Sequence, residues 1–344
     1  MAGIQTCISG SLPKPEWLAE PEKLWSPWLL DGEKLIEGKK KAIKIAVEEQ
    51  LKAGISIIAD GEQTRQHFVT TFIENLSGVD FKNKKKVRIR DRYDADVPVV
   101  FEEVKRLKPV YVHDARYLRT QTKLPIKYTL PGPMTMVDTL YDDYYKSREK
   151  LALQFAEILN SEAKELEAAG VNYIQFDEPA FNVFFDDVKN WGIRCLEKAA
   201  QGLKCKTVVH ICYGYGIEAN INWKKTLGNE WRQYENIFPL LAKSKINQIS
   251  LECQNSKVPI DLIKLLKGKD VLVGSIDVAT KEIETPEQVY KTLKKALEFV
   301  EAKNLYACTN CGMVNLPKHV AYEKMKSLAG GAKLLSKELG IIQE

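Results

Sequence analysis

His210 and Cys212 lie two residues apart at the end of a β-rich run, and both side chains can coordinate a metal ion. Because side chains in a strand alternate between its two faces, residues two apart point into the same space. Glu252 and Cys311 end or follow two later β-rich runs. One imidazole nitrogen, two sulfurs and one carboxylate oxygen form a natural tetrahedral ligand set for zinc. The pattern therefore predicts a zinc site.

The charge of this ligand set indicates what the metal would do. Two thiolates and one carboxylate leave a Zn²⁺ complex with about one net negative charge, which suppresses Lewis acidity toward carbonyl groups. Metal coordination also lowers the pKa of a bound thiol below its free value of about 8.5, so that the thiolate forms at neutral pH. We therefore expect thiol alkylation rather than hydrolysis. A substrate thiol would have to displace one of the four protein ligands or bind zinc as a fifth ligand.

Other roles for these residues stay open at this point. A histidine and a cysteine two residues apart are, by themselves, more often a hydrogen-bonded histidine beside a buried cysteine than half of a metal site. Cys308 and Cys311 could form a redox pair or half of a zinc knuckle, although no second Cys-x-x-Cys pair completes a knuckle. Asp60, Glu62 and Asp177 could cap helix N-termini. The cysteines expected only to pack are Cys7, Cys195, Cys205 and Cys253.

Eight short β-rich runs alternate with long amphipathic stretches and would position these residues. The runs are Ile4–Ser9, Ile55–Asp60, Ile126–Leu130, Tyr173–Phe176, Thr207–Ile211, Gln248–Leu251, Val271–Ser275 and Leu305–Thr309. Stretches with helical spacing include Leu151–Ala169, Pro286–Glu301 and Val320–Leu339. Such alternation favours parallel strands, and eight units close naturally into a barrel. We expect an α/β fold with a single (β/α)8 TIM barrel, formed by residues 1–344 as one domain, rather than an open doubly wound sheet.

The loops that follow the strands of such a barrel carry its functional residues. Ser9-Gly10-Ser11 follows the first run, and Asp60-Gly61-Glu62 follows the second. Asp177-Glu178-Pro179 follows the fourth. These acids and hydroxyl groups are therefore expected to meet the four candidate zinc ligands at one mouth of the barrel.

Two stretches do not fit a plain barrel. Residues 81–123 contain a basic loop, concentrated in residues 82–92, and strand-like pieces at Val97–Val104 and Pro109–Val112. This excursion is expected to form a hairpin over one rim. Pro13–Leu30 is rich in proline and tryptophan and is expected to wrap the outside or a rim.

Composition narrows the class of protein. Hydrophobic residues make up 44% and charged residues 28% of the chain, as in ordinary globular proteins. The net charge of +5 comes mostly from lysine runs on a helix face and in a loop, not from a basic patch interleaved with aromatics, so no nucleic-acid partner is expected. No apolar run reaches the ~18 residues of a membrane span. Without a secretion signal, the seven cysteines are expected to be reduced, in the cytoplasm.

Taken in order, the strand ends resemble the catalytic half of cobalamin-independent methionine synthases, in the uroporphyrinogen decarboxylase and methionine synthase superfamily. The family's Gly-Ser-Phe-Pro start resembles Gly-Ser-Leu-Pro at residues 10–13, and its acidic turn with a following arginine resembles residues 61–65. Its Gly-Pro-x-Thr and Asp-Glu-Pro-Ala motifs match residues 132–135 and 177–180. The motifs are specific as a set and cover nearly the whole chain.

The resemblance implies methyl transfer to the zinc-bound thiolate of L-homocysteine, which gives L-methionine. The family's zinc ligands fall on His210, Cys212, Glu252 and Cys311. The residues that it implies for homocysteine are Ser9, Gly10 and Ser11 around the substrate backbone, and Glu62 and Asp177 around its ammonium group.

The chain departs from the family at three positions that share one task, the binding of a folate donor. Thr139 stands where the family has a tryptophan that stacks on the pterin, and Val183 where it has a glutamate that binds the pterin. Ala279 stands where a histidine protonates the departing amine, so no general acid is found. A methylcobalt donor needs no such proton. These departures favour methylcobalamin as the donor, free or carried on a separate corrinoid protein.

Three other functions stay open. A synthase that uses methyltetrahydrofolate would share the same homocysteine side. A zinc enzyme that joins an epoxide to coenzyme M would have no use for Glu62 and Asp177, since coenzyme M is a sulfonate without an amino group. A non-enzymatic zinc-binding protein would hold the metal in an environment that ignores added homocysteine.

Overall fold

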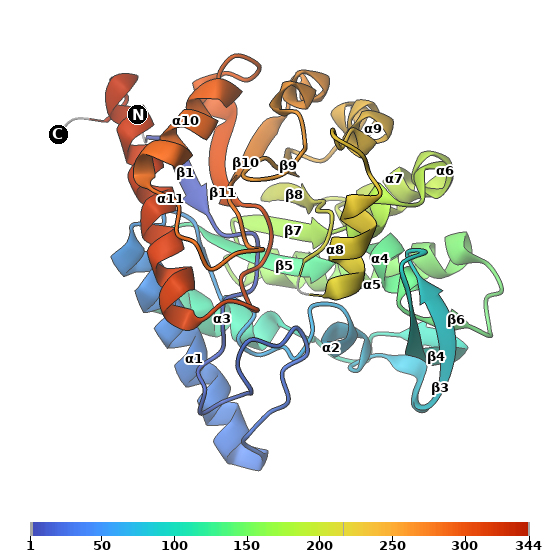
Figure 1. Cartoon of the computed structure of the whole chain (residues 1–344). Helices are drawn as coiled ribbons and strands as arrows, with labels where there is room; N and C mark the ends of the chain where they lie inside the picture. The colour runs from blue at the N-terminus through green and yellow to red at the C-terminus, as the bar shows by residue number, and fades with distance from the viewer. Residues whose placement is uncertain (1–2, 216, 343–344) are drawn as a thin grey trace.

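Eight parallel strands form one barrel with helices around it in the computed structural model, which describes residues 3–215 and 217–342 (Figure 1). Their order is β1-β11-β10-β9-β8-β7-β5-β2. The strands are β1 (Gln5–Cys7), β2 (Ile58–Ala59), β5 (Ile126–Pro131), β7 (Tyr173–Asp177), β8 (Lys206–His210), β9 (Gln248–Glu252), β10 (Asp270–Ile276) and β11 (Leu305–Thr309). Each overlaps one of the eight predicted runs, so the predicted α/β barrel is confirmed.

The sheet closes between its two outermost strands, β1 and β2. The Ile57 N–H donates to the Thr6 carbonyl oxygen at 3.0 Å. Thr6 and Ser56 add two bonds, in which each backbone N–H donates to the other residue's hydroxyl oxygen, at 2.8 and 2.9 Å. One backbone bond and two side-chain bonds therefore join these two short strands.

The helices that cover the barrel follow the predicted apolar periodicity. Leu151–Ala169, Pro286–Glu301 and Val320–Leu339 correspond to α5, α10 and α11. The helices are α1 (Gly32–Ala53), α2 (Thr70–Ile73), α3 (Val112–Gln121), α4 (Pro133–Asp138), α5 (Arg148–Ala168), α6 (Phe185–Asp187), α7 (Ile193–Ala199), α8 (Glu218–Lys225), α9 (Phe238–Lys243), α10 (Pro286–Ala296) and α11 (Lys318–Glu338). None of them, in the part of the chain described here, is long and apolar enough to cross a membrane.

A long hairpin departs from the barrel, as predicted, but its strands differ from the prediction. The small sheet consists of β3 (Ser77–Ile89), β4 (Tyr93–Lys105) and β6 (Tyr141–Asp142). The basic run at residues 82–86, predicted as a loop, lies within β3, where its side chains are exposed. Pro109–Val112, predicted as a strand, is not one, because Val112 already begins α3. Val97–Val104 lies within β4.

The tip of this hairpin reaches the mouth of the barrel. Arg90 adopts a positive φ of 49° at the turn, and its Nε lies 3.1 Å from the Asp138 carboxylate at the end of α4. Arg92 donates to the Tyr213 carbonyl oxygen at 3.0 Å and to Asn220 Oδ1 in α8 at 2.9 Å. The hairpin tip therefore contacts two separate parts of the rim. These contacts show what Arg90 and Arg92, at the end of the basic stretch 82–92, bind within the protein.

The segment Pro13–Leu30 lies at the rim, one of the two expected placements. It forms no helix or strand, and a single antiparallel bridge joins Ala19 and Trp28. Lys14 and Leu24 from this segment line the pocket at the barrel mouth. The segment is therefore part of the pocket wall.

Gly132 fits against a fully buried carboxyl group at the start of α4. Glu178 accepts hydrogen bonds from the N–H groups of Met134 and Thr135 at 3.0 and 2.9 Å and from the Thr135 hydroxyl at 2.8 Å. A Cβ at residue 132 would lie 2.1 Å from Glu178 Cδ. The Gly-Pro-x-Thr turn and the Asp-Glu-Pro-Ala turn are therefore a single packing unit, and Glu178 caps a helix, the role weighed above for neighbouring acids.

Gly132→Ala is expected to lower the free energy of unfolding by about 1–3 kcal/mol, because the added methyl group overpacks the Glu178 carboxyl. The matched control is Gly192→Ala, whose Cβ would meet the flexible Met134 Sδ at 3.2 Å. The control should change the free energy by less than about 1 kcal/mol. Urea denaturation of both variants measures the difference, and equal stabilities would contradict this packing.

Candidate active site

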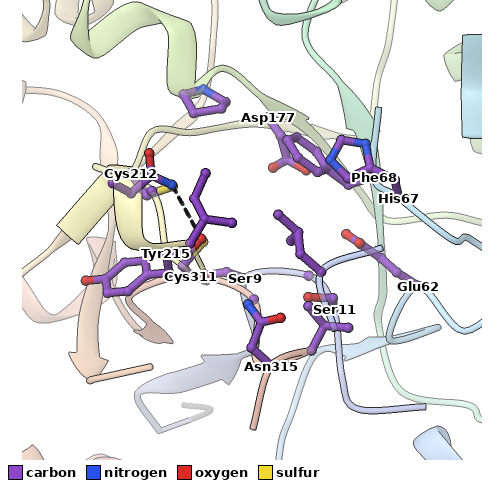
Figure 2. Close-up of a pocket in the computed structure, with 18 of the residues that line it drawn as sticks. Ser9, Ser11, Glu62, His67, Phe68, Asp177, Cys212, Tyr215, Cys311 and Asn315 are labelled. Carbon is purple, nitrogen blue, oxygen red and sulfur yellow. Dashed lines mark hydrogen bonds between the residues drawn. The ribbon is translucent and has the colours of Figure 1, made fainter. Parts of the chain in front are cut away.

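The carboxyl ends of the barrel strands surround one pocket, and eight of the nine predicted site residues line it (Figure 2). Its lining combines thiols, acids and small polar groups from loops far apart in the sequence. The predicted residues in the lining are Ser9, Gly10, Ser11, Glu62, Asp177, His210, Cys212 and Cys311. The fold therefore places these side chains at one mouth of the barrel, as their positions at the strand ends predicted.

Three of the four predicted zinc ligands form a compact group. One ligand atom each from His210, Cys212 and Cys311 lies within 4.8 Å of the others. The Cys212 and Cys311 sulfur atoms are 3.5 Å apart. His210 ends β8, and Cys311 follows β11 by two residues, so both come from the carboxyl ends of strands. The group offers two sulfurs and one nitrogen, the donor atoms that zinc favours.

Glu252, the fourth predicted ligand, lies at the end of β9 beside this group but outside it. Its side chain is fully buried, and the Tyr213 N–H donates to its Oε2 at 3.2 Å. Burial raises the pKa of the Glu252 carboxyl to about 7. Glu252 Oε1 has no hydrogen-bond partner among the described residues. The Glu252 carboxylate would have to move toward this group to complete a four-ligand site.

The histidine is oriented so that one ring nitrogen is left for a ligand. His210 Nδ1 lies 2.8 Å from Ser250 Oγ, whereas Nε2 is buried and has no partner among the described residues. A proton on Nδ1 would be donated to Ser250 Oγ, which leaves the Nε2 lone pair for a metal ion. Buried polar atoms without partners are rare and call for an explanation. Two of them, His210 Nε2 and Glu252 Oε1, beside two thiols fit a zinc site.

A hydrogen bond joins the Cys212 and Cys311 thiols and shifts their pKa values in opposite directions. The hydrogen bond from Cys311 and the nearby His210 lower the pKa of the Cys212 thiol well below its usual value. The same bond and burial raise the pKa of Cys311. Deprotonation is therefore easier at Cys212 than at Cys311, and a divalent cation would compensate the charge of a second thiolate.

The predicted substrate acids lie on the other side of the pocket. Glu62 lies across the cavity from Cys212 (Figure 2). Its Oε1 accepts a hydrogen bond from the Thr129 hydroxyl at 2.9 Å. Asp177 Oδ1 accepts one from Gln175 Nε2 at 2.7 Å, and burial raises the pKa of the Asp177 carboxyl to about 7. Each acid can therefore still accept hydrogen bonds from a cationic ligand group.

The glycine–serine loop after β1 uses the donors of Ser9 within the protein and leaves those of Gly10 and Ser11 free of partners among the described residues. The Ser9 N–H donates to the Thr309 hydroxyl at 2.9 Å, and the Ser9 hydroxyl donates to the Thr309 carbonyl oxygen at 2.5 Å. Ser9 lines the pocket but holds the loop to β11. The N–H groups of Gly10 and Ser11 form no hydrogen bond with any described residue.

Several pocket residues carry no signal that sequence reasoning could use. Lys14 belongs to the irregular rim segment, and Arg90 to the hairpin tip. His67 and Phe68 lie in the irregular stretch before α2, and the His67 ring stacks on Trp25 with the centroids 5.0 Å apart. Their placement depends on how irregular segments fold over the rim, and no motif marks them.

The three positions that depart from the family have different surroundings. Thr139 lines the pocket, and its hydroxyl donates to the Met136 carbonyl oxygen at 2.9 Å. Val183 and Ala279 are not among the lining residues. Ala279 is exposed.

Comparisons with known proteins identify similar chains. The family model of the catalytic domain of cobalamin-independent synthases matches residues 4–333. The methionine synthases of Sulfurisphaera tokodaii and Sulfolobus acidocaldarius are 31% and 30% identical over 338 residues, or 98% of this chain and 94% and 93% of theirs. A B12-independent methionine synthase from Shewanella sp. W3-18-1, solved in complex with selenomethionine, is 64% identical with a TM-score of 0.97, and the match covers 99% of this chain and 100% of that one.

These comparisons correct the expected methyl donor. The family is cobalamin-independent and the Shewanella protein is B12-independent, so methylcobalamin as the donor is contradicted. The expectation of a corrinoid protein as a partner loses its basis with it. The inference was wrong because Thr139, Val183 and Ala279 show only which groups the donor side lacks. No residue in the chain had pointed positively to a corrinoid.

Cys311→Ala is expected to weaken zinc binding roughly 100- to 1,000-fold, since one of four ligands contributes about a quarter of the ~10–16 kcal/mol of a structural zinc site. A zinc titration against a competing chelator measures the affinity, and circular dichroism checks that the barrel stays folded. Cys205→Ser is the matched control, because Cys205 precedes β8 at the opposite end of that strand. Unchanged zinc affinity in Cys311→Ala would contradict the site.

Proposed function

Because the chain belongs to the catalytic-domain family of cobalamin-independent methionine synthases, and is thus a methyltransferase, we propose that it transfers a methyl group to the thiolate of L-homocysteine. The product is L-methionine. Zinc held by His210, Cys212, Glu252 and Cys311 is the proposed cofactor. The observation that carries this proposal is the compact group of His210, Cys212 and Cys311, in which the buried His210 Nε2 has no partner among the described residues.

The protein's own residues would bind and orient the amino acid. Glu62 and Asp177 would accept hydrogen bonds from the substrate ammonium group, which fixes the α-carbon on the side of the pocket away from the thiols. The substrate side chain would then extend toward Cys212 and Cys311. Zinc, when bound, would keep the substrate sulfur deprotonated at neutral pH. The complex of a similar chain with selenomethionine supports a pocket that accommodates a thioether amino acid.

We propose methyltetrahydrofolate as the methyl donor, because the comparisons contradict methylcobalamin. Its leaving amine must gain a proton as the methyl group departs. Ala279 cannot donate that proton, so water in the pocket is the proposed source. Thr139 lines the pocket but offers no aromatic face, and hence the pterin would be held by other groups than in the family at large.

An epoxide transfer to coenzyme M fits less well. A sulfonate ligand would meet Glu62 and Asp177, two acids facing the cavity, and like charges there are unfavourable. A zinc-binding protein without activity would leave these acids without a ligand. We further propose that residues 1–344 act as one domain and that the protein works in the cytoplasm.

Removal of zinc with a chelator is expected to abolish methionine formation from L-homocysteine and methyltetrahydrofolate, because the substrate thiol would then stay mostly protonated, given its free pKa of about 8.5. Adding zinc back should restore turnover. Quantification of methionine by mass spectrometry provides the measurement. Full activity of the zinc-free protein would refute the proposed cofactor, and a zinc-loaded protein inactive with both substrates would refute the donor.

Glu62→Gln is expected to raise the KM for L-homocysteine about 10- to 100-fold, because a charged hydrogen-bond partner of the ammonium group contributes about 1.5–3 kcal/mol. The amide can still accept the hydrogen bond from Thr129, so the fold should be retained. Steady-state kinetics at saturating donor gives the KM. The exposed Glu102 on β4 provides the control variant Glu102→Gln. An unchanged KM in Glu62→Gln would show that the ammonium group binds elsewhere.

A further inference from the structure

Lys14 is a buried cation in the pocket wall without a charged partner. Its side chain lines the pocket, and the residue is only 6% exposed. It forms no hydrogen bond or ion pair with any residue in 3–215 or 217–342. Its ammonium group lies 5.9 Å from the centroid of the Trp28 ring. Burying a charge costs free energy unless the charge is paired. A ligand anion would supply the missing partner.

The other lysine and arginine side chains that line the pocket are already paired. Arg65 donates to the Asp60 carboxylate at 3.3 Å and to the Thr129 hydroxyl at 2.7 Å. Arg90 is neutralised by Asp138. Among the described lysines and arginines that line the pocket, Lys14 is therefore the one whose charge remains available to a ligand.

Lys14 lies close to Glu62, one of the two acids that would bind the ammonium group. The Glu62 carboxylate attracts the Lys14 ammonium electrostatically, yet the two form no ion pair. A Cβ at Gly10 would lie 2.5 Å from Glu62 Oε1, so the loop that carries Lys14 packs directly on this acid. The free N–H groups of Gly10 and Ser11 belong to the same loop. Opposite charges side by side match an α-amino acid, whose ammonium and carboxylate groups share one carbon atom.

We propose that Lys14 binds the α-carboxylate of the amino-acid substrate and product, while Glu62 and Asp177 bind the ammonium group. This assignment rests on the proposed function and adds to it the residue that recognises the carboxylate. The N–H groups of Gly10 and Ser11 would complete the carboxylate site. Its position next to Glu62 favours the carboxylate of the amino acid over one carried by the methyl donor.

The ionisation of Lys14 agrees with this role. Burial lowers the pKa of the Lys14 ammonium to about 8, against the opposing effect of Glu62. The group therefore remains mostly charged at neutral pH. A bound carboxylate would stabilise the charged form further, because an opposite charge nearby favours ionisation.

The test compares two ligands that differ only in the carboxylate. The zinc-loaded protein is titrated with L-methionine and with (methylthio)propylamine, which is methionine without its carboxylate. Lys14→Met is expected to weaken L-methionine binding about 10- to 100-fold, the effect of losing a hydrogen bond to a charged group. Binding of the amine should change less than about twofold, since the amine makes no use of Lys14. Lys14→Met should be at least as thermally stable as the wild type, because it removes an unpaired buried charge.

Lys39→Met is the matched control. The Lys39 ammonium lies 4.6 Å from the centroid of the same Trp28 ring, but Lys39 does not line the pocket. The control should bind L-methionine as the wild type does. An equal loss of both ligands in Lys14→Met would mean a structural role and would overturn the assignment.

Two further outcomes separate this assignment from the proposed function. If Lys14→Met binds L-methionine normally and instead shows a raised KM for methyltetrahydrofolate, the carboxylate belongs to the donor and the assignment is overturned while the function stands. If the wild type binds neither L-methionine nor L-homocysteine, the proposed function fails and the assignment fails with it.

Discussion

The candidate site depends on buried ligand atoms that the protein itself leaves unsatisfied. His210 Nε2 and Glu252 Oε1 are buried without partners among the described residues, and the sulfur atoms of Cys212 and Cys311 lie 3.5 Å apart. An unsatisfied buried polar group costs about 1–3 kcal/mol. A chain that keeps two of them beside a pair of thiols gains stability from a metal ion that satisfies all of them, and zinc fits this set of donors.

The closed barrel explains why these atoms meet. Strands β8, β9 and β11 all end at the same mouth, separated in the sheet only by β10. The alternation of side chains then sorts neighbouring acids into different roles. Asp177 faces the pocket, whereas Glu178 caps α4 and packs against Gly132. The same turn therefore supplies one residue to the pocket wall and another to the scaffold.

The eight strands, and the shared location of the candidate ligands His210, Cys212 and Cys311, could be predicted because both follow from regular patterns. Buried parallel strands show as apolar runs, and functional residues collect where such strands end. The hairpin was harder: the lysines of residues 82–86 are exposed in β3, so no burial pattern marks that strand. Lys14 and Arg90 come from irregular segments whose course depends on tertiary contacts. The donor was misjudged because missing residues show which groups the donor side lacks and do not identify the donor.

The central claim is that the thiol-rich site holds zinc and that zinc takes the substrate sulfur. X-ray absorption spectroscopy at the zinc edge, recorded before and after addition of L-homocysteine, tests it most directly. The account predicts that a nitrogen or oxygen ligand is replaced by, or joined by, an additional sulfur when homocysteine binds. A zinc environment identical with and without homocysteine, in protein that demonstrably binds the amino acid, would contradict it.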